Sequence, residues 1–205
     1  MLHALRLNAL LLLCLCAFPA PARSQNATTA TATPASVEGF NCIANRTYPY
    51  QAYALSRAGF AGVPLDLAAI GDLFAVSRFM VAHANSLSTT VAPANGQPLL
   101  VPFQCDCPSR SSSSYAPMQY QIAPGDTYWI VSTTKLQNLM QYQSVQHVNP
   151  TVPTDLDVGT MVTFPVFCQC PAAAADNATT LVTYVMQPGD TYVSVAGAFS
   201  VAYPQ

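Results

Sequence analysis

Few side chains in this chain are placed to do acid–base chemistry. Asp155 and Asp157 are the only close pair of carboxylates in residues 119–167, and they lie in the turn-rich segment NPTVPTDLDVG. The sequence shows no buried partner for them and no nucleophile with a base at a catalytic spacing. We therefore expect this chain not to be an enzyme.

Cysteines offer a second chemistry, as metal ligands or as disulfides. Cys105 and Cys107 form one Cys-x-Cys pair, Cys168 and Cys170 form another, and Cys42 brings the number of cysteines after the N-terminal segment to five. Zinc sites typically use Cys-x₂-Cys spacing, whereas cysteines of secreted chains form disulfides. We expect no metal and no cofactor, and an odd number of cysteines competing to pair.

The first 24 residues are predicted to be a secretory signal peptide. Arg6 precedes an apolar run from Leu10 to Phe18, and Ala22 and Ser24 suit positions −3 and −1 of a cut before Gln25. No later segment offers about 20 continuous apolar residues, so no membrane span is expected. The predicted location is therefore secreted or extracellular.

Charge is sparse, which favours a neutral ligand. The chain has seven Lys and Arg residues against nine Asp and Glu, and its net charge without the signal peptide would be about −4. Because no Lys/Arg cluster exists, nucleic acid and anionic membrane are not expected as partners.

Asn26, Asn45 and Asn177 begin Asn-x-Ser/Thr sequences, which predict glycosylation at the surface.

A repeat organises the rest of the chain. Residues 120–127 read YQIAPGDT and residues 184–191 read YVMQPGDT. In the first copy an alternating strand pattern leads into a Pro-Gly turn, and Asp126 or Thr127 would cap the following helix. The segment LQNLMQYQSVQHVN predicts a second helix ended by Asn149 and Pro150, and TMVTFPVF predicts a closing strand.

This strand–helix–helix–strand order divides the chain into small units. The predicted divisions are a signal peptide (1–24), a flexible leader (25–40), a first unit without the PGDT turn (41–104), a Cys-x-Cys hinge (105–118), a second unit (119–167), a second hinge (168–180) and a partial third unit (181–205). Units of this size have small cores, so cross-links between them are expected.

These motifs resemble those of LysM proteins. The Tyr-x-x-x-x-Gly-Asp-Thr opening, the Asn-Pro before the loop and the closing strand are similar to that module, and the Cys-x-Cys spacers resemble the ectodomains of plant LysM receptor-like kinases. NRTYPYQAYAL with LAAIGDLFAVSR most resembles the branch with inactive kinases, which includes chitin and lipochitooligosaccharide receptors. The resemblance implies an α+β fold of tandem βααβ modules, cross-linked by disulfides, with the third module incomplete.

The resemblance also implies a binding groove for N-acetylglucosamine oligomers, with a LysM co-receptor kinase as a possible partner. Two loops of the second unit would form the groove: Ala123, Pro124, Gly125, Asp126, Thr127 and Tyr128 on one side, and Asn149, Pro150, Thr151, Val152, Pro153, Thr154 and Asp155 on the other. Backbone groups would bond the acetamides of a chitooligosaccharide or lipochitooligosaccharide. Tyr128, Val152 and Pro153 are expected to form contact surface, while Gly125 and Asp126 set the loop. Trp129 could reach the sugar or be buried.

The family's pattern has six cysteines, and this chain has Tyr50 at the position of one of them. The pairing implied by the resemblance is Cys42–Cys107 and Cys105–Cys168, with Cys170 as a free thiol.

The third unit carries one strand, the PGDT turn and one helix. We expect its strand to lack a partner from its own unit, and the tail after about residue 180 to fray and expose Val185, Val193 and Phe199. The chain is thus expected to be a truncated receptor product that binds ligand outside the cell; as part of a full-length receptor it would lie at the outer face of the plasma membrane. The alternatives are a non-binding decoy fragment without signalling ability, and the targeting module of a cell-wall hydrolase.

Overall fold

The computed structural model describes residues 39–42, 49–60, 66–108, 111–170 and 180–202, all within the compact unit Ala35–Gln205. The predicted signal peptide and the three predicted glycosylation sites lie outside the described residues.

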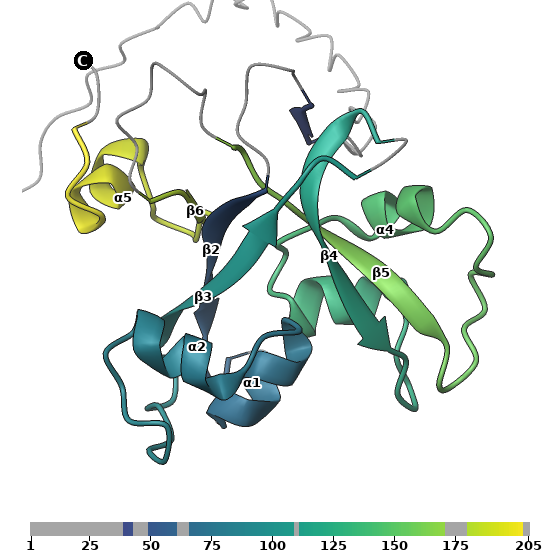
Figure 1. Cartoon of the computed structure of the whole chain (residues 1–205), viewed down its shortest axis with the longest axis horizontal. Coiled ribbons are helices and arrows are strands. Elements are labelled where there is room, and N and C mark those ends of the chain that lie inside the picture. The colour runs from purple at the N-terminus through teal and green to yellow at the C-terminus, as the bar shows by residue number, and fades with distance from the viewer. Residues whose placement is uncertain (1–38, 43–48, 61–65, 109–110, 171–179, 203–205) are drawn as a thin grey trace, which may run out of the picture. The chain divides into compact units, whose positions relative to one another are not determined.

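Two antiparallel strand pairs organise the fold (Figure 1). β2 (Tyr50–Arg57) pairs with β3 (Pro98–Cys105) along its whole length, and β4 (Ser113–Gln121) pairs with β5 (Met161–Phe167). Buried and more exposed residues alternate along β2, as expected for a strand with one face on the core. β4 begins within the segment that the sequence analysis assigned to the first hinge.

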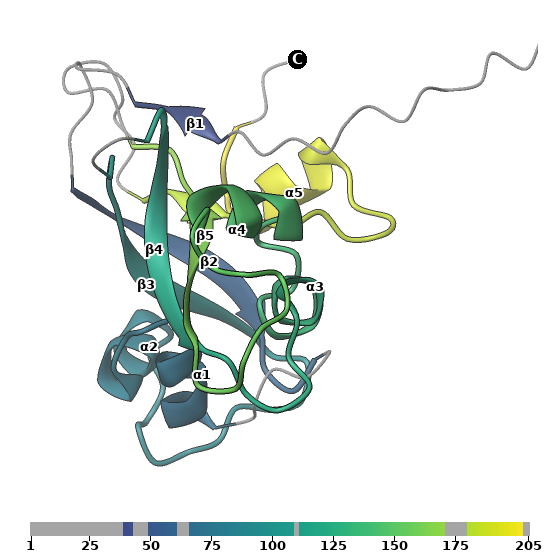
Figure 2. The ribbon, with the colours of Figure 1, turned by 90° about the vertical axis from the view of Figure 1, so that its right-hand side faces the viewer.

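Helical segments connect the strands of each pair. α1 (Leu67–Leu73) and α2 (Arg78–Ala84) lie between β2 and β3 in the sequence. Between β4 and β5 lie α3 (Tyr128–Ile130), its continuation as the π-helical turn η1 (Val131–Lys135), and α4 (Tyr142–Val148), which packs on β5 (Figure 2). Both units therefore have the predicted βααβ order.

The second helix of the second unit is shorter than predicted. The sequence pattern predicts one helix over residues 136–149, but α4 begins only at Tyr142. Gln137 and Asn138 have φ of 50° and 62°, a left-handed conformation that breaks a helix. Leu136 and Met140 are nevertheless buried, because the turn between the helical segments also packs on the core.

Two short strands extend the pairs. β1 (Phe40–Asn41) pairs with β4, and β6 (Val182–Thr183) pairs in parallel with β2. The strand of the third unit was expected to lack a partner from its own unit, in a tail that frays; the structure instead pairs it with β2 of the first unit, where the Tyr53 N–H donates to the Leu181 carbonyl at 2.9 Å. The following α5 (Tyr192–Ala198) has no buried residue.

Disulfides join the units. Cys42 is bonded to Cys107, and Cys105 to Cys168, which are the two pairs implied by the resemblance. The two cysteines of the first Cys-x-Cys pair, Cys105 and Cys107, are thus bonded to different partners. Cys170 is buried, with its sulfur 3.7 Å from the Cys105 carbonyl oxygen.

Within the described part of the chain, no single helix has the length and apolar composition needed to cross a membrane. α1 and α2 reach these values only when taken together, and they are bent by 106° at the break between them.

Candidate functional site

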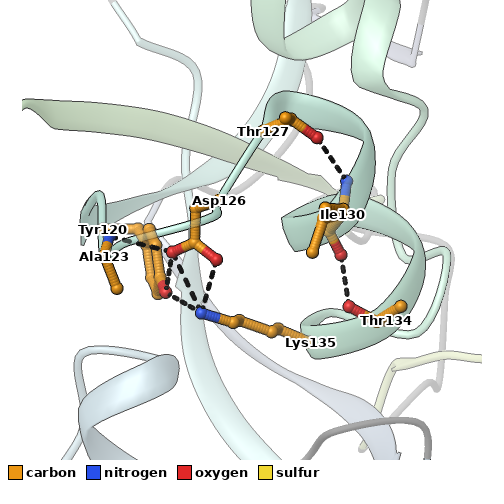
Figure 3. A network of polar contacts seen from close by, with 7 residues as sticks. All are labelled: Tyr120, Ala123, Asp126, Thr127, Ile130, Thr134 and Lys135. Atoms are coloured by element: carbon orange, nitrogen blue, oxygen red, sulfur yellow. Dashed lines mark hydrogen bonds and ion pairs between the residues drawn. The ribbon is translucent and has the colours of Figure 1, made fainter. Parts of the chain in front are cut away.

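The PGDT segment of the second unit builds a turn that the Asp126 side chain closes (Figure 3). Gly125 has φ of 83°, which glycine adopts without the steric cost of a side chain. The Asp126 N–H donates to the Ala123 carbonyl at 3.1 Å, and the Ala123 N–H donates to Asp126 Oδ2 at 2.9 Å. The turn and the carboxylate therefore hold each other in place, as the sequence analysis expected of Gly125 and Asp126.

A partly buried ion pair completes this network (Figure 3). The Tyr120 hydroxyl donates to Asp126 Oδ2 at 2.7 Å, and Lys135 Nζ lies 2.7 Å from Asp126 Oδ1 and also donates to the Tyr120 hydroxyl. The Asp126 side chain is only 4% exposed. Burial alone would raise the pKa of Asp126, but hydrogen bonds from Lys135, Tyr120 and Ala123 and the charge of Lys135 hold it below its ordinary value.

Lys135 is the member of this network that the sequence analysis missed. Burial favours a lower pKa for Lys135, but its hydrogen bonds to Asp126 and Tyr120 outweigh burial, so the pKa is raised and the ammonium stays charged. Lys135 is the only lysine in the chain. Its position at the end of the helical segment that follows the PGDT turn was the sequence signal that could have suggested a charged partner for Asp126.

Thr127 and Tyr128 begin the helical segment. The Thr127 hydroxyl accepts a hydrogen bond from the Ile130 N–H at 3.0 Å, which caps α3. Tyr128 is 4% exposed, and its ring meets Phe164 edge-on at 6.4 Å between centroids. Its hydroxyl donates to the Pro153 carbonyl at 3.3 Å. Tyr128 is thus a buried link between the two loops, and the expectation that it forms open contact surface is wrong.

Asn149 anchors the second loop from inside the fold. It is 8% exposed, and its side-chain N–H groups donate to the carbonyls of Val145 and Thr163, each at 2.7 Å. Its Oδ1 accepts from the Thr163 N–H at 3.0 Å. The side chain therefore ties the end of α4 to the edge of β5, and none of its polar atoms is left over for a ligand.

The same anchor occurs in the first unit. Asn85 donates to the carbonyls of Val81 and Leu100 at 2.8 Å, and its Oδ1 accepts from the Leu100 N–H at 2.8 Å. The third unit repeats the PGDT turn instead: Asp190 Oδ2 accepts from the Tyr184 hydroxyl and the Gln187 N–H, each at 2.7 Å. The repeated motifs therefore build local structure in each unit.

The remaining loop residues form the accessible surface. Val152 is half-buried and packs against the core, and Ala123 is also half-buried. Trp129, next to Tyr128, is 57% exposed. The exposed residues of the predicted site are Pro124, Gly125, Thr127, Pro150, Thr151, Pro153, Thr154 and Asp155.

This surface offers loop backbone, proline rings and threonine hydroxyls. Among the described residues, no group of three or more His, Cys, Asp or Glu side chains could hold a metal ion. The arrangement suits recognition of an uncharged polar ligand by hydrogen bonds and apolar contact.

The repeated βααβ units and their disulfides are features of the LysM ectodomains that the sequence resembles, and comparison with known proteins supports this likeness. Residues 113–167 match the model of the NFP LysM2 domain. The chain is a LysM-domain protein that resembles the ectodomains of plant LysM receptor-like kinases.

Two curated relatives make the likeness specific. The chain is 33% identical over 106 residues to "Protein LYK2" of Arabidopsis thaliana, which covers 51% of this chain and 16% of that protein. It is 31% identical over 144 residues to "LysM domain-containing GPI-anchored protein LYP4" of Oryza sativa subsp. japonica, which covers 64% of this chain and 35% of that protein. The chain thus spans about a third or less of the length of these relatives.

The fold is also that of a solved ectodomain. The crystal structure of the ectodomain of a receptor like kinase superposes with a TM-score of 0.64 at 23% identity, covering 77% of this chain and 81% of that chain.

Proposed function

We propose that this chain binds N-acetylglucosamine oligomers outside the cell, at the surface formed by residues 123–128 and 149–155. The observation that carries the proposal is the hydrogen bond between the Tyr128 hydroxyl and the Pro153 carbonyl, which holds the two loops beside each other. A ligand that contacts one loop can therefore contact the other. The two disulfides and the likeness to receptor ectodomains support an extracellular location.

The loop residues fall into two groups, those whose polar atoms bond the protein itself and those left exposed to a ligand, and this division supports a neutral ligand. The side chains of Asp126 and Asn149 form hydrogen bonds within the protein, so they position the loops and do not bind sugar. Backbone groups and the hydroxyls of Thr151 and Thr154 remain for acetamide and hydroxyl groups of the sugar. The exposed Trp129 ring supplies an apolar face at one end of this surface.

A shallow site of this kind should bind at about micromolar level, roughly −8 kcal/mol. A chitooligosaccharide is the simplest ligand, and a lipochitooligosaccharide is the decorated form of the same chemistry. A LysM co-receptor kinase is the protein partner we propose, by analogy with the receptor-like kinases that the chain resembles.

Calorimetric titration of the secreted chain with a chitin tetramer tests the proposal. Trp129→Ala should weaken binding by about tenfold, because an exposed aromatic contact is lost. Phe79→Ala is a matched control, since Phe79 is 60% exposed and lies on α2 of the first unit. Val152→Asp, checked for folding by thermal melting, should weaken binding further because it places a charge between the loops.

Unchanged affinity in both Trp129→Ala and Val152→Asp would show that the two loops are not the binding site. A wild-type chain that gives no heat with any chitin oligomer would favour the non-binding alternative.

A further inference from the structure

A separate cavity of about 570 Å³ lies between α1 of the first unit and the β4–β5 pair of the second. This volume is in the range of small-ligand sites. It is lined by Ala69, Asp72, Leu73, Gln119, Tyr120, Gln121, Lys135 and Met161, and therefore by none of the residues of the two loops. Two of these residues, Tyr120 and Lys135, belong to the network that holds the PGDT turn (Figure 3).

Three side chains of the cavity have hydrogen-bonding capacity to spare. Asp72 is exposed on α1, and no described residue donates a hydrogen bond to its carboxylate. Gln119 gives one N–H to the Thr163 hydroxyl at 2.9 Å, and Gln121 makes only a long contact of 3.5 Å to the Gly159 carbonyl. Each glutamine therefore keeps its amide oxygen and an N–H available.

The charges in the cavity do not select an anion. The Lys135 ammonium is already bonded to the Asp126 carboxylate and the Tyr120 hydroxyl, so its charge is compensated. The Asp72 carboxylate would repel a phosphate or a carboxylate ligand. A hydroxyl group, by contrast, can donate to Asp72 and accept from a glutamine amide.

The rest of the wall is aliphatic. Leu73 is 7% exposed and Met161 is 52% exposed, so together they offer an apolar contact that runs from the interior to the surface. Acceptors, amide groups and an aliphatic face in one open cavity match an uncharged sugar ring, which carries hydroxyls at its edge and C–H groups on its face.

We propose that the cavity between α1 and the β4–β5 pair binds one unit of a neutral N-acetylated oligosaccharide, as a second sugar site distinct from the two loops. Asp72 accepts from sugar hydroxyls, and the amides of Gln119 and Gln121 bond the remaining hydroxyl or acetamide groups. The choice of sugar rests on the proposed function, whereas the place of the site rests on the cavity.

Such a site would be connected to the first one through Asp126. The cavity wall residues Tyr120 and Lys135 both bond the Asp126 carboxylate, and that carboxylate holds the Ala123 amide in the PGDT turn. Occupation of the cavity should therefore steady the turn that borders the loop site.

The test is an NMR titration of the ¹⁵N-labelled full chain with di-N-acetylchitobiose. The side-chain amide signals of Gln119 and Gln121 are the direct probes, and each is assigned by its loss in the corresponding Gln→Ala variant. We expect both signals to shift saturably. Asp72→Ala should weaken this response by about tenfold, since a hydrogen bond to a charged group is lost. Gln104→Ala, at an exposed glutamine on β3 outside this cavity, should leave it unchanged.

The outcomes separate this inference from the proposed function. Shifts confined to backbone amides of residues 123–130 and 149–155, with the glutamine amides unmoved, would overturn the second site and leave the loop site standing. Shifts of the glutamine amides alone would support the cavity and count against the loop site. A full response in Asp72→Ala, or no shift at either place, would overturn the inference.

Discussion

Replacing Asn149 with alanine should destabilise the second unit by about 3 kcal/mol. The substitution removes three hydrogen bonds, from the side chain to the carbonyls of Val145 and Thr163 and from the Thr163 N–H to the side chain. Each such bond contributes about 1 kcal/mol, and buried groups left without a partner cost more than the bond itself. Because Asn149 is 8% exposed, water would not easily replace these bonds.

Urea unfolding monitored by tryptophan fluorescence measures this loss of stability in the second unit. Trp129 is the only tryptophan in the chain, and it lies on α3 of the second unit. Asn85→Ala removes the equivalent three bonds from the first unit and should show its loss of about 3 kcal/mol by circular dichroism. Asn95→Ala is the control, since Asn95 is exposed in the loop before β3.

A loss below about 0.5 kcal/mol for Asn149→Ala, similar to an ordinary surface substitution, would refute the anchoring role. It would also remove the physical reason for treating the loop after α4 as fixed.

Three further predictions concern the turn and the link between the loops. The lowered pKa of Asp126 means that the unfolded chain binds more protons, so stability should fall as pH drops below about 4, and acid titrations of Asp126→Asn should lack that part of the loss. Gly125→Ala should lower the free energy of unfolding in urea by about 1 kcal/mol. At φ of 83° an added Cβ would meet no atom within 4 Å, so this cost comes from the backbone conformation and not from a clash. An unchanged free energy of unfolding would contradict the left-handed turn. Tyr128→Phe keeps the buried ring but loses the bond to Pro153, so calorimetry should show weaker chitin binding with a stability loss of only about 1 kcal/mol, whereas unaltered binding would argue against the link.

Local patterns were sufficient to predict the order of elements and the turn. The alternation before Pro124, the Pro-Gly corner and the Thr127 cap depend on residues within a few positions of each other, and the structure contains all three. The sequence also repeats a short motif, HAN at 83–85 and HVN at 147–149, which ends with Asn85 and Asn149. It did not reveal that both side chains reach across to a strand edge.

The features that sequence reasoning missed depend on contacts between distant parts of the chain. Tyr128 is a large polar aromatic residue next to an exposed Trp129, and only the position of Phe164 and Pro153 decides which of the two is buried. The parallel pairing of β6 with β2 joins residues more than 120 positions apart, with Tyr53 opposite Val182, and no local pattern encodes it.

The same limit applies to the ion pair. Lys135 was visible as a lone cation, but its bond to Asp126 depends on how the η1 turn brings its side chain back over the PGDT loop.

Hydrogen–deuterium exchange of the purified chain, measured with and without a chitin tetramer at saturating concentration, tests directly whether the sugar binds at residues 123–128 and 149–155. We predict slower exchange in peptides covering residues 123–130 and 149–156, with the corresponding loops of the first unit unchanged, because in the proposed complex the sugar bonds the exposed backbone of the second unit alone. Protection found only elsewhere, or no protection at a concentration where calorimetry shows binding, would contradict the assignment of the sugar site to these two loops.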